Sequence, residues 1–208
     1  MGYQLITAPT FEPLSVSDVK LHLREDDTSQ DVLIGLLITA VRQYCEQRTA
    51  RSLVTQQWAL VMDSFPQMGT LNYSMWGKPH GLPGNALLIE KGPVQSIDSI
   101  TYIDYNSATQ TMPSTDYVAD LTGPLVRVTP RFGKIWPITL PQINAATVNF
   151  TAGYGVAAAV PEGLKAWIKL RIGALYENRE EVISGRAITI TPLPFVDRLL
   201  DPYTIIRA

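Results

Sequence analysis

The sequence predicts an α+β fold in which helices near both ends of the chain form a frame around an antiparallel β-rich insertion. Two changes of pattern support this. Apolar residues recur at helical spacing up to about residue 50 and again after residue 160, whereas short β-like runs separated by turn residues fill the middle. We expect a single domain over 1–208, with helical parts at 14–50 and 160–208 and the β-rich insertion at 54–151.

The N-terminal part is expected to form two helices. Ser15 with Asp18 three residues later is a helix-start signal, because side-chain oxygens and an acidic group suit the exposed amides of a first turn. A second start signal, Thr28–Asp31, opens a helix that we expect to end near Arg48.

This second helix is apolar over much of its circumference, whereas a surface helix needs only one apolar stripe. We assign the main stripe to Val32, Leu33, Leu36, Leu37, Ala40, Val41, Tyr44 and Cys45. Ile34 and Ile38 fall on another side. The helix is therefore expected either to lie at the centre of its own core or to be covered by another subunit, and Ile34 and Ile38 are the candidate subunit-interface residues.

The middle of the chain reads as short strands. They are predicted at 57–62, 86–90, 97–103, 117–119, 125–128 and 146–150. Turn-rich stretches separate them, which favours an antiparallel sheet or barrel over alternating βαβ units. The Gly- and Pro-rich segment 68–85 is expected to be either a mobile loop or a contact loop.

The stretch VNFTAGYGVAAAVPEGL, residues 148–164, matches the letters of a dinucleotide-binding fingerprint. That motif needs a helix directly after the glycines, inside a βαβ unit. Pro161 disfavours helix at the residue before it, and no suitable βα unit follows. We therefore interpret Gly153, Gly155 and Pro161 as a structural hinge between a strand and the last long helix.

Other motifs for catalysis or metal binding are absent from the sequence. His22 and His80 are the only histidines and lie far apart, Cys45 is the single cysteine, and neither a P-loop nor a Gly-x-Ser-x-Gly elbow occurs. We expect no cofactor, no bound metal and no enzymatic activity. The formal net charge of −2 does not indicate a general polyanion binder, and the apolar window 32–41 is too short to span a membrane.

The segment VNFTAGYGVAAAVPEGLKAWIKLRIGALYENRE resembles the C-terminal half of the head–tail connector proteins, also called adaptor or head-completion proteins, of long-tailed bacteriophages and gene transfer agents. The similar positions are the Ala-Gly-Tyr-Gly of 152–155, Val160–Pro161 and the Leu-Tyr-x-x-Arg-Glu of 175–180. Segments 14–24 and 31–41 are similar to the opening helix pair of that family. The ending Leu199–Tyr203, followed by Arg207, is similar to its terminal motif.

The resemblance implies a structural protein of the virion neck, made in the host cytoplasm. Such proteins form a ring, expected to be a dodecamer, under the portal protein. The ring extends the DNA channel and joins the head to the next neck or tail component, a stopper or a tail terminator. DNA is expected to pass through without specific binding, and no membrane is involved.

The resemblance also makes the C-terminal tail the candidate portal-contacting segment. It comprises Leu199, Leu200, Asp201, Pro202, Tyr203, Thr204, Ile205, Ile206 and Arg207. Pro202 ends any preceding helix, and residues 203–206 favour an extended strand that could add to the sheet edge or groove of a partner. The alternative is a tail that folds back on its own helices.

Two other functions remain open at this stage. One is a different neck or tail structural protein, such as a stopper with a β-barrel core, although the long C-terminal helix argues against it. The other is a small ligand-binding domain or enzyme that uses the loop Gly77–Gly84 as a lid.

Overall fold

The computed structural model describes residues 1–66, 85–178 and 194–205, and its contacts divide the chain into two compact units. The β unit comprises Met1–Pro9, Thr55–Gly153 and Ile205–Ala208, and the helical unit comprises Thr10–Val54 and Tyr154–Thr204. The expected limits of the insertion, 54 and 151, lie within two residues of these boundaries. That the two units fold as a single domain stays a prediction.

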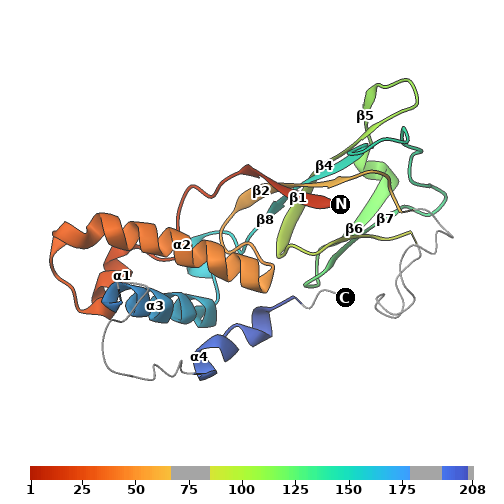
Figure 1. The fold of residues 1–208 in the computed structure, drawn as a ribbon. Helices are drawn as coiled ribbons and strands as arrows, with labels where there is room; N and C mark the ends of the chain where they lie inside the picture. The colour runs from red at the N-terminus through yellow and green to blue at the C-terminus, as the bar shows by residue number, and fades with distance from the viewer. Residues whose placement is uncertain (67–84, 179–193, 206–208) are drawn as a thin grey trace. The chain divides into compact units, whose positions relative to one another are not determined.

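The helical unit consists of three packed helices and a short fourth one. Helices α1 (Val16–Leu23), α2 (Asp31–Thr49) and α3 (Glu162–Glu177) contact one another pairwise, and α4 (Pro194–Arg198) contacts α3 (Figure 1). Single 3₁₀ turns at Thr28–Gln30, Ala157–Ala159 and Asp201–Tyr203 complete the unit.

Both predicted N-terminal helix starts are confirmed. Ser15 caps α1 as half of a capping box: its hydroxyl accepts from the Asp18 amide at 3.1 Å, and the Asp18 carboxylate accepts from the Ser15 amide at 3.1 Å. Hydrogen bonding by Ser15 lowers the pKa of Asp18. Asp27 caps the 3₁₀ turn that leads into α2 by accepting from the Ser29 amide at 3.0 Å.

The predicted orientation of α2 is wrong. The core stripe is Ile34, Ile38, Val41 and Cys45, and Ile34 and Ile38 are only 0% and 1% exposed. Val41 and Cys45 belong to the apolar set expected from the sequence, but Val32 and Leu36 of that set are 78% and 65% exposed. Both sets of residues have helical spacing, and packing against α1 and α3 decides which face is buried. Ile34 and Ile38 therefore cannot contact another subunit without unfolding this core.

A buried ionic network fixes the chain on both sides of α2. The Arg42 guanidinium, in a residue only 5% exposed, donates through Nε to Glu12 Oε2 at 2.6 Å and through Nη1 to Glu46 Oε2 at 2.8 Å. Glu12 also accepts from the Thr39 hydroxyl at 2.9 Å, and Glu46 Oε1 accepts from the Leu53 amide at 2.8 Å. Segments before α1 and after α2 are thus attached to the same helix.

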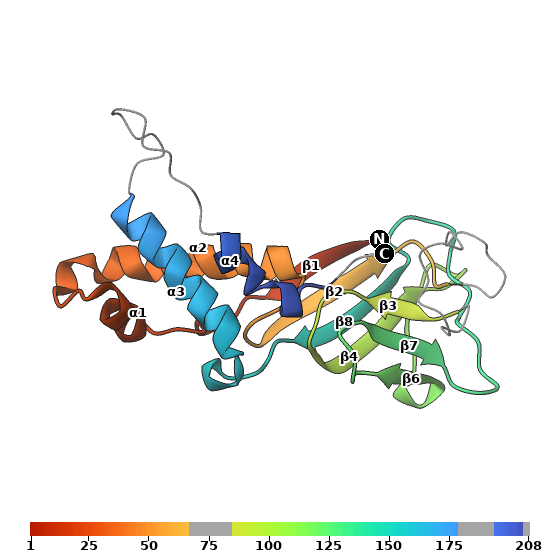
Figure 2. The same ribbon diagram turned by 90° about the horizontal axis from the view of Figure 1, so that it is seen from below.

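The β unit contains two antiparallel sheets, so the predicted α+β class with an antiparallel insertion is confirmed (Figure 2). The five-stranded sheet has the order β1 (Gly2–Thr7), β2 (Gln56–Met62), β8 (Ala146–Ala152), β4 (Val94–Ile103), β5 (Thr109–Thr111). The three-stranded sheet has the order β3 (Leu87–Ile89), β7 (Val126–Pro130), β6 (Tyr117–Asp120), and a 3₁₀ turn at Ser114–Asp116 precedes β6.

The two sheets share one core. Strand β8 shows why: alternate residues Val148 and Phe150 are buried, and they meet Val126 and Ile89 of the smaller sheet in one cluster. The edge strand β1 is absent from the sequence-based prediction. Five of its six residues are exposed to solvent, and it is held by backbone pairing with β2.

Replacement of Arg42 by Met should destabilise the helical unit by about 3–5 kcal/mol, because Glu12 and Glu46 then lose their buried partner. Urea unfolding followed by circular dichroism measures the change. Arg48→Met on the same helix is the matched control. Its side chain is 44% exposed and pairs at 3.4 Å, so the loss should not exceed about 1 kcal/mol. Equal losses in the two variants would contradict the role assigned to Arg42.

Replacement of Ile38 by Asp should unfold the helical unit, since an unpaired charge in this core costs more than about 4 kcal/mol. Leu36→Asp, at an exposed position of the same helix, should change the free energy of unfolding of the monomer by no more than about 0.5 kcal/mol. Thermal unfolding of both variants measures the difference. A folded Ile38→Asp protein would show that the buried face of α2 is assigned wrongly.

Candidate interaction surfaces

The candidate hinge residues occupy a bend between β8 and α3. Gly153 and Gly155 have φ values of 132° and 100°, which residues with a side chain rarely adopt. Helix α3 begins only at Glu162, and Pro161 precedes it as the N-cap. The glycines therefore do not lead directly into a helix N-terminus, as phosphate binding would require. That this segment acts as a hinge stays a prediction.

The described part of the C-terminal tail folds back on its own chain. Leu200 is 2% exposed within the helical core, and Tyr203 packs so closely on Gly163 that a Cβ there would lie 3.1 Å from the tyrosine ring. The Arg51 guanidinium donates to the Tyr203 carbonyl. Residues 201–203 form a 3₁₀ turn, so the expectation of an extended strand from 203 onward is wrong for Tyr203.

The exposed residues of the tail are Asp201, Pro202 and Thr204, while Leu199 is partly buried against the helical core. Ile205 belongs to the β unit, where it is 6% exposed and lies near Gly92. Ile206 and Arg207 lie outside the described residues. Among the described tail residues, Asp201, Pro202 and Thr204 are the ones whose side chains are exposed to a partner.

Asp197 of α4 anchors the segment before the tail. Its carboxylate accepts from Arg171 at 2.7 Å, from the Trp167 indole at 3.1 Å and from Arg48 at 3.4 Å. Hydrogen bonding by Arg171, followed by that of Trp167, lowers the pKa of Asp197. Because the donors come from α2 and α3, this one carboxylate attaches α4 to both helices.

Several large apolar side chains point into solvent, and the sequence analysis missed them as a surface. In the β unit they gather in the segment between β7 and β8, residues 131–145, here called the β7–β8 loop: Phe132 is 104% exposed, Ile135 77%, Ile138 60% and Ile143 77%. In the helical unit Leu21 of α1 is 83% exposed, and Val32 and Leu36 of α2 are 78% and 65% exposed. Exposed apolar groups gathered on one segment are typical of interaction surfaces.

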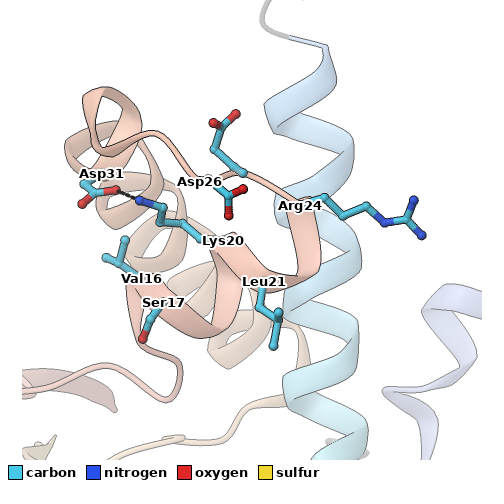
Figure 3. Close-up of a pocket in the computed structure, with 8 residues that line it drawn as sticks. Val16, Ser17, Lys20, Leu21, Arg24, Asp26 and Asp31 are labelled. Atoms are coloured by element: carbon cyan, nitrogen blue, oxygen red, sulfur yellow. Dashed lines mark hydrogen bonds and ion pairs between the residues drawn. The ribbon is translucent and has the colours of Figure 1, made fainter.

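A hollow of about 630 Å³ lies beside α1 (Figure 3). It is lined by Val16, Ser17, Lys20, Leu21, Arg24, Glu25, Asp26 and Asp31. Lys20 and Asp31 face each other across it in an ion pair of 2.8 Å, whereas the Arg24 side chain extends away from that pair (Figure 3). Three carboxylates against two cations leave the lining slightly acidic, and no nucleophile–base pair is present in it.

The described residues contain no group of three or more His, Cys, Asp or Glu side chains arranged to hold a metal ion. Within the same residues, no helix has the length and hydrophobicity needed to cross a bilayer. Cys45 is buried, and burial raises the pKa of its thiol to about 12. The candidate loop lid at 77–84 and His80 lie outside the described residues.

Replacement of Leu200 by Ala should lower the free energy of unfolding by about 2–5 kcal/mol, because a buried leucine is removed from the helical core. Thr204→Ala, at an exposed position of the same tail, is the control and should have little effect. Urea unfolding measures both. A Leu200→Ala protein as stable as wild type would mean that the tail does not pack on the helices in solution.

A family model described as Phage gp6-like head-tail connector protein matches residues 13–123, which is more than half of the chain. The match includes the opening helix pair and the strands from β2 to β6. No curated protein gives a significant match.

Solved structures of gene transfer agent (GTA) particles contain chains with a similar fold. A chain from the neck of an empty GTA particle, computed with C6 symmetry, is 21% identical with a TM-score of 0.72. A chain from the virion of the native particle is 20% identical, also with a TM-score of 0.72. A chain from the neck of the native particle, computed with C12 symmetry, is 21% identical with a TM-score of 0.69. Each comparison covers 100% of this chain and 97% of the other.

These structures are similar to the protein in fold, and the family match identifies the kind of protein. The resemblance found at residues 14–24 and 31–41 lies inside the matched region, and the family is one of structural connectors rather than enzymes. The chain belongs to the Phage gp6-like head-tail connector protein family.

Proposed function

We propose that the protein assembles as a ring in the neck of a phage or gene transfer agent particle, under the portal protein. The ring extends the DNA channel and joins the head to the next neck or tail component. The observation that supports this most directly is the family match together with full-length similarity in fold to chains from GTA necks computed with C6 and C12 symmetry.

The surface of the chain agrees with assembly into a closed ring. In a ring each subunit uses two different faces, one toward each neighbour. Exposed apolar side chains are present in both units, including Phe132 and Ile135 in the β unit and Leu21 and Val32 in the helical unit. Such side chains gain free energy when a neighbour removes them from water, by about 25 cal/mol for each Å² of apolar surface.

The charge of the subunit is compatible with a channel through which DNA moves. Each phosphate neutralised by a protein cation adds binding free energy through counterion release, and this would slow the passage of DNA. A subunit with a formal net charge of −2 does not present a strong general attraction for DNA. We propose that DNA passes without sequence-specific contact.

For the described part of the C-terminal tail, contact with the portal is proposed only for its exposed residues. Leu200 and Ile205 are buried in their own chain, so they hold the tail in place. Asp201, Pro202 and Thr204 are exposed, and they are the described tail residues available to a partner. The opposite face of the ring would meet a stopper or tail terminator.

The purified protein should form closed rings of a single size, alone or when mixed with the portal protein of the same particle, because the apolar surfaces above require a neighbour. Mass photometry gives the number of subunits, and negative-stain electron microscopy shows whether the assembly is closed. Portal protein alone is the control. A chain that remains monomeric both by itself and with the portal would contradict the proposed function.

A further inference from the structure

The β7–β8 loop presents its apolar side chains to solvent while its backbone is firmly attached to the β unit. Trp136 is only 3% exposed: it stacks on Phe65 with ring centroids 4.8 Å apart and donates from its indole to the Asn85 carbonyl at 2.7 Å. Further along, the Leu140 amide donates to the Ile103 carbonyl at 2.9 Å. A loop anchored in its middle cannot turn its outer residues inward without losing these contacts.

The two ends of the same loop are also attached to the β unit. The Arg131 amide donates to the Asp116 carbonyl at 2.9 Å, the Lys134 amide donates to the Arg131 carbonyl at 2.9 Å, and the Lys134 ammonium pairs with the Asp116 carboxylate at 3.2 Å. The Asn144 amide donates to Asp63 Oδ1 at 2.9 Å. Exposure of Phe132, the most exposed large apolar residue described, is therefore built into the fold.

The charges of the loop indicate the chemistry of its partner. Residues 131–145 include Arg131 and Lys134 but no carboxylate, and because Lys134 is paired with Asp116, the positive charge offered to a partner is mainly that of Arg131. A complementary surface must offer apolar contact together with negative charge. The α1 hollow has both: Leu21 is 83% exposed at its edge, and Glu25 and Asp26 line it.

The cations of the hollow do not cancel this complementarity. Lys20 is paired with Asp31, so the remaining charges of the lining are the carboxylates of Glu25 and Asp26 against the single cation of Arg24, which extends away from that pair (Figure 3). Asp27, which follows Asp26, adds a further exposed carboxylate to the same turn.

We propose that the β7–β8 loop of one subunit docks into the α1 hollow of a second copy of this chain. The two surfaces differ, so the contact is heterologous, and repeated contacts of this kind form a ring when the rotation between neighbouring subunits closes. Apolar contact is made by Phe132 and Ile135 against Leu21 and Val16, and Arg131 approaches Glu25 and Asp26. The inference rests on the proposed ring and names the surfaces that form it.

Mixtures of two variants, each with one added cysteine, test the pairing directly. Cys45 is buried, with the pKa of its thiol raised to about 12, so it does not interfere with mild oxidation. Chains bearing Phe132→Cys are mixed with chains bearing Leu21→Cys, which restricts a loop-to-hollow disulfide to two different copies. We expect the mixed dimer to form in excess over either homodimer, as resolved by mass spectrometry.

Truncation and charge reversal supply a second readout. Phe132→Ser should raise the dissociation constant of self-association roughly tenfold or more, since an interface anchor is lost. Tyr105→Ser is the matched control, because it removes an equally aromatic side chain, 64% exposed, from the hairpin between β4 and β5 of the same unit. Arg131→Glu should weaken association, and the double variant Arg131→Glu with Asp26→Arg should recover it.

The outcomes separate this inference from the proposed function. Rings that form normally with Phe132→Ser, without the mixed disulfide, would overturn the pairing and leave the ring intact. Homodimers linked through Phe132→Cys alone would instead show a symmetric contact between two loops and would also overturn it. A wild-type chain that never self-associates, with or without the portal, would overturn both.

Discussion

The buried guanidinium of Arg42 fixes the path of the chain on both sides of helix α2. It binds Glu12, which lies before α1, and Glu46, whose second oxygen holds the Leu53 amide after the helix ends. A charge so deeply buried is tolerated only when its donors find acceptors, so all of these contacts are required together. The residues joined in this way belong to Thr10–Val54, the N-terminal part of the helical unit. In the sequence β1 precedes this segment and β2 follows it. Because β1 and β2 pair in one sheet, this N-terminal part of the helical unit is inserted in the sequence between two adjacent strands, whereas Tyr154–Thr204 follows β8.

The elements with a strong local signal could be predicted from the sequence. Ser15 with Asp18 marked the start of α1, and the β-branched and aromatic residues of 146–150 marked β8, because in both cases the local pattern and the final packing agree. Strand β1 could not be predicted, since its residues are mostly exposed and it is defined mainly by pairing with β2. The face of α2 was chosen wrongly because Val32 and Leu36 repeat at the same spacing as Ile34 and Ile38, and only contact with α1 and α3 distinguishes the two sets.

The candidate interaction surfaces were less accessible to sequence reasoning. Trp136 and Phe132 stand in the same irregular segment, yet one is buried under Phe65 and the other is fully exposed. An irregular loop has no sequence periodicity that would show which of the two side chains is buried. The hydrogen bonds and ring contacts that attach the loop determine this. In the tail, Leu200 and Tyr203 were expected from the sequence to contact a partner. In the structure they pack in the helical core of their own chain. A connector of this kind therefore combines a tail that stabilises its own fold with apolar residues held outward by a rigid loop.

Hydrogen–deuterium exchange of the assembled ring, compared with the dissociated chain, tests most directly which surfaces make the assembly. The account predicts new protection at residues 131–143 and at 20–27, with little change at 199–205, which are already packed in the monomer. Protection confined to residues 199–205, with the β7–β8 loop exchanging as fast in the ring as in the free chain, would contradict it.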